Sequence, residues 1–148
     1  MVMNPYDCRV SLQVRHPTLS AHELCKGIPL KVRIKRSRGE ELHREAHQGD
    51  QSHADASYCV FELGPPTGAG LVEAFNLWLD QLAPAAEFIS SLRSSGGEVR
   101  LYLAWFSDKN SGEVFDWRLF SRLAELRVDL ALDFYPRLPP QPAPWKGV

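Results

Sequence analysis

Hydrophobic and polar residues alternate with a period of two in several segments, and this pattern predicts β-strands. Val10, Leu12 and Val14 alternate with polar residues, as in a strand that buries one face and exposes the other. Similar alternation, or a run of β-branched and aromatic residues, indicates four more strands. The five expected strands span residues 8–15, 30–35, 58–63, 99–106 and 128–135.

Between these strands, hydrophobic residues recur at helical spacing. Ser20 begins a capping box and Asp116 is a typical N-cap, so each predicts the start of a helix. The longest helix is expected over residues 71–82, and Pro84 fits the first turn of a second helical piece. The order β-α-β-β-α-β-α-β predicts an α+β fold with one twisted, mostly antiparallel sheet of about five strands and helices mainly on one face.

The segment 128–135 is expected to be the buried strand around which the fold is organised. Its alternate residues are apolar, whereas Asp129 and Asp133 lie on the other face. We expect it to neighbour the first strand, where Arg9 and Arg15 would face the two aspartates. The segment 99–106 is expected to be the central strand. Asp129 and Asp133 lie about 13 Å apart along a strand, so we interpret them as charge matching rather than as a catalytic pair.

Length and composition predict one domain. The chain has 148 residues, 44% hydrophobic content and a formal net charge of -1, as in ordinary soluble domains. We expect a domain over residues 1–136 and a proline-rich tail over residues 137–148. No apolar run has the length of a membrane span and the N-terminus lacks a signal-peptide pattern, so we expect a cytoplasmic protein. The spacing of the three cysteines argues against a disulfide framework or a structural zinc site.

The polar segment 37–57 is the candidate for metal binding. It is longer than most structureless connections, and we interpret it as a mobile or a functional loop. His43 and His47 are four residues apart and could bind a metal from one helix face. Glu45 between them matches neither of the known zinc-protease motifs. We therefore favour a solvated loop and expect no cofactor.

The segment 31–38 is the most basic part of the chain. Together with Arg100, Tyr102 and Phe106 on an outer sheet face, it could bind nucleic acid through phosphate contacts and base stacking. The near-neutral net charge favours a different interpretation, an edge strand whose charges prevent aggregation. In the tail, Trp145 could cover the aromatic residues of the open face.

The chain resembles a bacterial family known only as domain of unknown function 4279. Three short motifs carry the resemblance: Val10 to Pro17, Arg38-Gly39-Glu40 and Leu132 to Tyr135. The resemblance implies a fold but no activity. The chain departs from the family pattern where Tyr58 or Cys59 replaces a tryptophan. It departs again at Arg127, which replaces a glycine after the last helix, at a position where a positive φ disfavours other residues.

No residue set forms a nucleophile motif or a phosphate-binding loop. We therefore expect a non-catalytic interaction or ligand-binding module, such as an immunity or regulatory protein, that uses the open sheet face. The candidate binding residues are Tyr102, Phe106, Tyr135, Arg15 and Arg100. The expected partner is a protein, a second copy of the chain or a small molecule, and not a nucleic acid or a membrane. The alternatives are a metal-dependent hydrolase using His43 and His47, and then nucleic-acid binding through residues 31–38.

Overall fold

Strands and helices follow one another along the chain in the predicted order. The computed structural model describes residues 6–39, 55–64 and 70–136. The elements are β1 (Asp7–His16), α1 (Ala21–Gly27), β2 (Val32–Arg36), β3 (Ser57–Glu62), α2 (Leu71–Leu82), η1 (Ala83–Ala85), α3 (Ala86–Ser94), β4 (Glu98–Ser107), α4 (Trp117–Leu126) and β5 (Asp129–Pro136).

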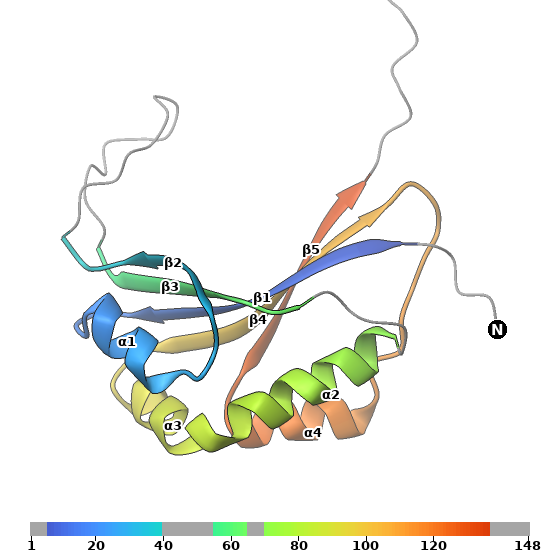
Figure 1. Ribbon diagram of the computed structural model, residues 1–148. Helices are drawn as coiled ribbons and strands as arrows, with labels where there is room; N and C mark the ends of the chain where they lie inside the picture. Colours follow the sequence, from blue (N-terminus) through green and yellow to red (C-terminus); the bar gives the residue numbers. More distant parts are fainter. Residues whose placement is uncertain (1–5, 40–54, 65–69, 137–148) are drawn as a thin grey trace, which may run out of the picture.

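The five strands form a single mixed sheet in the order β2-β3-β1-β4-β5. Three neighbouring pairs are antiparallel, whereas β4 and β5 are parallel. The helices lie on one side of the sheet (Figure 1), so the predicted α+β fold is confirmed. The prediction that residues 99–106 form the central strand is only partly right, because β4 is interior but β1 occupies the middle position.

The prediction that β5 is a buried strand beside β1 is wrong. β5 lies at the edge of the sheet and pairs with β4 alone. Both hydrogen-bonding edges of β1 are already used, by β3 on one side and β4 on the other. A parallel neighbour requires a crossover connection, which α4 provides between β4 and β5. Because β5 is an edge strand, its residues Leu132 and Phe134 are 44% and 63% exposed.

The core lies between the helix-facing side of the sheet and the inner faces of the helices. β1 contributes Leu12 and Val14, and β4 contributes Leu101 and Leu103, all with no exposed surface. The helix expected over residues 71–82 is α2, and a stripe at helical spacing along it is buried: Leu71, Phe75, Leu79 and Leu82. Alternation in the strands and helical spacing in α2 therefore identify the same core from both of its sides.

The predicted helix ends are confirmed by their hydrogen bonds. Ser20 and Glu23 form a capping box at the start of α1, and the Asp116 carboxylate accepts from the backbone N–H of Leu119 at 3.0 Å to begin α4. Arg127 follows α4 with φ 56°, the left-handed conformation expected where the resembled family has glycine. Local sequence signals therefore determine where these helices begin and end.

The helices cover only part of the sheet. In Figure 1 one end of β1, β4 and β5 extends past the helices. At this end the Tyr6 ring stacks on Trp105, with 3.8 Å between the ring centroids, and its hydroxyl donates to Glu113 at 2.9 Å. Trp105 is consequently only 5% exposed. The stacked rings close the core where no helix covers it.

Candidate ligand-binding surface

The side of the sheet opposite the helices, which we call the open face, has a hollow at its centre. The hollow has a volume of about 310 Å³ and receives side chains from all five strands. Four aromatic side chains and two arginines line it: Tyr58, Tyr102, Phe106, Tyr135, Arg9 and Arg33. No acidic side chain and no histidine is among the described residues of the lining.

Small apolar residues lie between the larger side chains of the hollow. Val60 and Ala104 line the hollow but are only 3% and 6% exposed. On β4, Ala104 lies between Tyr102 and Phe106, which point to the same face because side chains alternate along a strand. The small side chain of Ala104 leaves space between two large rings, and this difference in size produces the concave shape.

Two tyrosines of the hollow share one carboxylate. Tyr102 on β4 donates a hydrogen bond from its hydroxyl to Asp133 on β5, and the hydroxyl of Tyr135 donates to the same oxygen, Oδ2, at 2.7 Å. These hydrogen bonds lower the pKa of the Asp133 carboxyl, and the bond to Asp133 raises the pKa of the Tyr102 hydroxyl. At neutral pH Asp133 is therefore ionised and Tyr102 keeps its proton.

Aromatic contacts hold the neighbouring part of the hollow. The rings of Phe106 and Tyr135 are stacked with their centroids 5.0 Å apart and their planes at 17°. The guanidinium carbon of Arg9 lies 6.0 Å from the centroid of Phe106, within the range of a cation–π contact. Tyr135 thus contacts both Phe106 and Asp133, and its ring is fixed from two sides.

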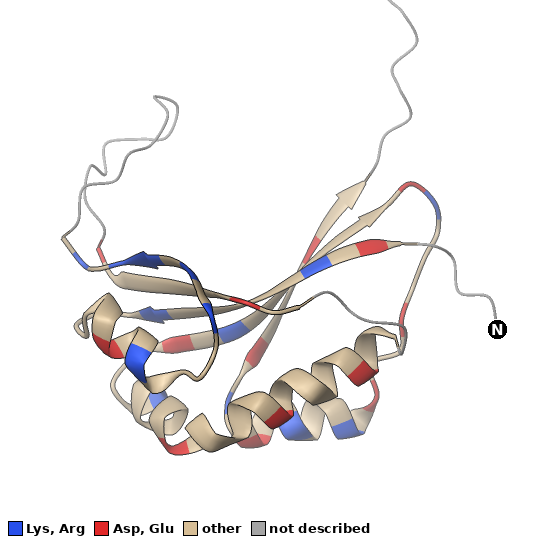
Figure 2. Cartoon of the chain, viewed as in Figure 1, with Lys and Arg blue, Asp and Glu red and all other residues tan. Residues whose placement is uncertain are grey.

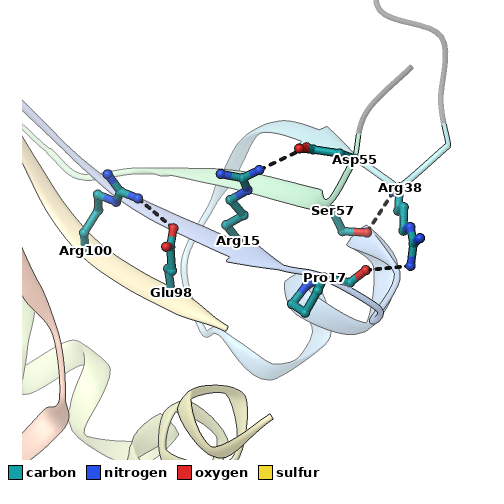
Figure 3. A network of polar contacts seen from close by, with 7 residues as sticks. All are labelled: Arg15, Pro17, Arg38, Asp55, Ser57, Glu98 and Arg100. Atoms are coloured by element: carbon teal, nitrogen blue, oxygen red, sulfur yellow. Dashed lines mark hydrogen bonds and ion pairs between the residues drawn. The ribbon is translucent and has the colours of Figure 1, made fainter. Parts of the chain in front are cut away.

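The arginines of the open face differ in their charge partners. Figure 3 shows Arg15 paired with Asp55 and Arg100 paired with Glu98, at 3.0 and 2.8 Å. Arg9 and Arg33 form no ion pair with any residue in the described ranges. The charges of Arg9 and Arg33 are therefore available to an anion in the hollow.

The structure brings together three of the five predicted binding residues. Tyr102, Phe106 and Tyr135 line the same hollow. Arg15 and Arg100 are on the open face but do not line the hollow. In the β1–β4 register Arg100 lies opposite Gln13, closer to the end of the sheet where Arg15 lies opposite Glu98. A binding role of all five residues stays a prediction.

The predicted pairing of Arg9 and Arg15 with Asp129 and Asp133 is wrong. β4 separates β1 from β5, so residues of these two strands cannot lie opposite each other. Asp129 instead forms an ion pair with Arg93 of α3 at 2.8 Å. Asp133 accepts from the two tyrosines described above.

Sequence reasoning missed Arg9, Tyr58 and Ile34 as residues of the site. Arg9 was expected to match the aspartates of β5, from which β4 separates it. Tyr58 could have been found, because its position on β3 alternates with the buried Cys59. Arg33 belongs to the basic segment 31–38 that was expected on an outer sheet face, and it lines the hollow. Ile34 could not have been found, because the β2–β3 register shifts at this position and places its side chain in the hollow.

The metal prediction concerns residues that the structure does not describe. His43 and His47 lie in the segment 40–54, outside the described residues, as does Trp145 in the tail. Within the described ranges, no cluster of three or more histidine, cysteine or acidic side chains could hold a metal ion. The metal-dependent hydrolase stays a prediction.

Comparisons with known proteins add no assignment. No family model, curated protein or solved structure matches the chain, so the resemblance to domain of unknown function 4279 stays a prediction. Among the described residues, no helix has the length and apolar character needed to cross a membrane. Function must therefore be argued from the geometry of the open face.

Proposed function

We propose that the protein is a non-catalytic ligand-binding module and that the hollow on the open face is its binding site. Small-molecule sites are typically concave, mostly apolar, about 300–1,000 Å³ in volume and equipped with a few polar groups. The hollow has a volume of about 310 Å³, aromatic walls and two arginines without an ion-pair partner in the described chain. This combination is the observation that carries the proposal.

The chemistry of the hollow supports binding rather than catalysis. A general acid or base works best with a pKa near the operating pH, but the pKa of Asp133 is lowered and that of Tyr102 is raised. The buried thiol of Cys59 is no better as a nucleophile, because burial raises its pKa to about 12. Ser11 lines the hollow without a histidine or carboxylate beside it in the lining.

The hydrogen bonds within the hollow also favour binding. Asp133 fixes the hydroxyls of Tyr102 and Tyr135, which lie 3.2 Å apart, and Phe106 fixes the Tyr135 ring by stacking. Side chains that are already ordered lose little conformational freedom when a ligand binds. The aromatic part of the hollow is therefore preorganised for a ligand.

Nuclear magnetic resonance with the isotope-labelled full chain tests the proposal. Titration with a library of small fragments is expected to shift the backbone amides of Ser11, Gln13, Val60 and Ala104. Phe106→Ala should weaken binding of the fragments by about tenfold, because it removes one aromatic wall.

Phe120→Ala is the matched control, since Phe120 is 51% exposed on α4. This variant should bind the fragments as the wild type does. Amide shifts confined to the helices, or unchanged binding by Phe106→Ala, would show that the hollow is not the binding site.

A further inference from the structure

We infer that the ligand of the hollow is a small planar anion, an aromatic ring that bears a carboxylate or phosphate group. This inference rests on the proposed function and specifies its ligand. It follows from the positions of charge, ring faces and hydrogen-bond donors around the hollow.

The cationic side of the hollow is formed by β1 and β2. Arg9 and Arg33 are exposed side chains without an ion-pair partner in the described ranges. A guanidinium presents parallel N–H donors that match the two oxygens of a carboxylate or phosphate. No acidic side chain of the described chain lines the hollow. The carboxylate of Asp133, which bonds to two of the lining tyrosines, accepts from their hydroxyls and forms no ion pair with either arginine.

The aromatic side of the hollow is formed by β4 and β5. The rings of Tyr102, Phe106 and Tyr135 surround the small Ala104 side chain. Phe106 and Tyr135 already stack on each other, so a planar group would contact their remaining surface and the Tyr102 ring across the small Ala104, by stacking or edge contacts. A volume of about 310 Å³ accommodates a ligand of modest size, such as one fused ring system with a single charged group.

Hydrogen bonding determines which way such a ligand would lie. The hydroxyls of Tyr102 and Tyr135 donate to Asp133, so they can offer only oxygen lone pairs to a ligand. Lone pairs repel the oxygens of an anion. The anionic group therefore belongs beside Arg9 and Arg33, with the ring over β4. Tyr58 on β3 keeps its proton, because burial raises its pKa, and it can donate to the anion.

The charge distribution favours a small anion over a nucleic-acid strand. A polynucleotide requires a continuous basic track along the surface. Figure 2 shows acidic and basic positions interspersed along the strands. Five acidic residues of the described strands alternate onto the open face, and three of them form ion pairs with neighbouring cations: Asp7, Glu62, Glu98, Asp129 and Asp133. These acidic positions interrupt any continuous basic track along this face.

The test compares charged and neutral ligands of the same shape. The full chain is titrated with naphthoate, naphthyl phosphate, neutral naphthamide and inorganic phosphate, and the amide shifts are followed. Naphthoate or naphthyl phosphate is expected to shift Ser11, Gln13 and Ala104 and to bind at least about tenfold more tightly than naphthamide. The better of the two anions identifies the charged group, and inorganic phosphate is expected to bind weakly because it has no ring.

Substitutions of the arginines test their role. Arg9→Gln and Arg33→Gln should each reduce the affinity for the aromatic anion by about tenfold and leave that for naphthamide unchanged. Lys35→Gln is the matched control, because Lys35 lies opposite the core residue Cys59, on the other face of β2, and its removal should leave both affinities unchanged. Arg9 and Arg33 are exposed, and the amide spectrum of each variant verifies its fold.

Different failures have different meanings. If naphthamide binds in the hollow as tightly as the anions, the ligand class is wrong while the hollow remains a binding site. A single-stranded oligonucleotide that outcompetes naphthyl phosphate, with an affinity that falls steeply with salt, would replace the inference with nucleic-acid binding. If neither these ligands nor the fragment library shifts the amides of the hollow, the proposed function itself fails.

Discussion

His16 at the end of β1 is a buried polar residue, 1% exposed, whose hydrogen bonds define its protonation state. Its Nδ1 accepts from the backbone N–H groups of Thr18 and Leu19 at 3.1 and 3.0 Å. A ring nitrogen that accepts carries no proton, so the hydrogen is on Nε2 and points to the Ser95 hydroxyl at 2.9 Å. Protonation of Nδ1 would break the turn that follows β1.

This arrangement predicts an acid-sensitive contribution to stability. Burial lowers the pKa of His16 below its value in the unfolded chain, about 6.5. The unfolded chain therefore binds more protons as the pH falls through about 6.5 and below, and the free energy of unfolding decreases. His16→Asn keeps an acceptor oxygen for the turn but cannot be protonated. Between about pH 8 and 5 it should lose less stability than the wild type in urea unfolding.

The exposed His22 provides the control for this experiment. His22→Asn should lose as much stability on acidification as the wild type. If His16→Asn also loses as much stability as the wild type, protonation of His16 does not contribute to the acid sensitivity.

Arg127 is a residue whose backbone conformation disfavours its side chain. Its φ of 56° and ψ of 41° are left-handed, which is unfavourable for a residue with a Cβ atom. Its carbonyl accepts from Arg93 at 2.8 Å, a contact that any residue can make. Arg127→Gly should therefore raise the free energy of unfolding by up to about 1 kcal/mol. Arg127→Ala, which keeps the Cβ, should give no such gain in thermal or urea unfolding, and equal effects of the two changes would exclude backbone strain.

At the scale of elements, Arg93 connects α3 to the parallel β4–β5 pair. Its side chain donates to the carbonyls of Arg127 and Val99 at 2.8 and 2.9 Å and forms an ion pair with Asp129 at 2.8 Å. The side chain is only 20% exposed. It therefore joins the residue after α4 to the start of the edge strand.

Loss of this connection should loosen β5 more than the other strands. Arg93→Ala is expected to reduce the free energy of unfolding by about 1.5–3 kcal/mol, the usual range for hydrogen bonds that involve a charged group. Hydrogen exchange should accelerate most for amides of Asp129 to Asp133. Arg93→Lys keeps the charge but lacks the planar fork, so it should recover only part of the loss. Uniform acceleration in all strands would contradict a local role.

At the scale of the whole molecule, β1 and not β5 holds the sheet together. Leu12 on β1 has no exposed surface, whereas Leu132 on β5 is 44% exposed. Leu12→Ala should reduce the free energy of unfolding by about 2–5 kcal/mol, as for other fully buried leucines. Leu132→Ala should reduce it by less than about 1 kcal/mol. Urea unfolding measures both, and similar losses would mean that β5 is covered in solution.

The open face also belongs to this scale, because its hollow needs all five strands. Three of its aromatic residues, Tyr102, Phe106 and Tyr135, could be selected from the sequence, since alternation places each on the outer side of a strand. The sequence could not predict that these residues lie close to Asp133. Their proximity depends on the parallel register that sets Tyr135 opposite Phe106 and Asp133 opposite Ala104.

Local features of this chain were readable without a structure. The alternation of Val10, Leu12 and Val14, the capping box of Ser20 and the N-cap of Asp116 depend on residues a few positions apart. Strand order, the edge position of β5, the partners of Asp129 and Asp133 and the irregular β2–β3 register depend on contacts between distant segments. Periodicity shows which face of a strand is apolar, but a strand's neighbours follow from how the crossover connections pack.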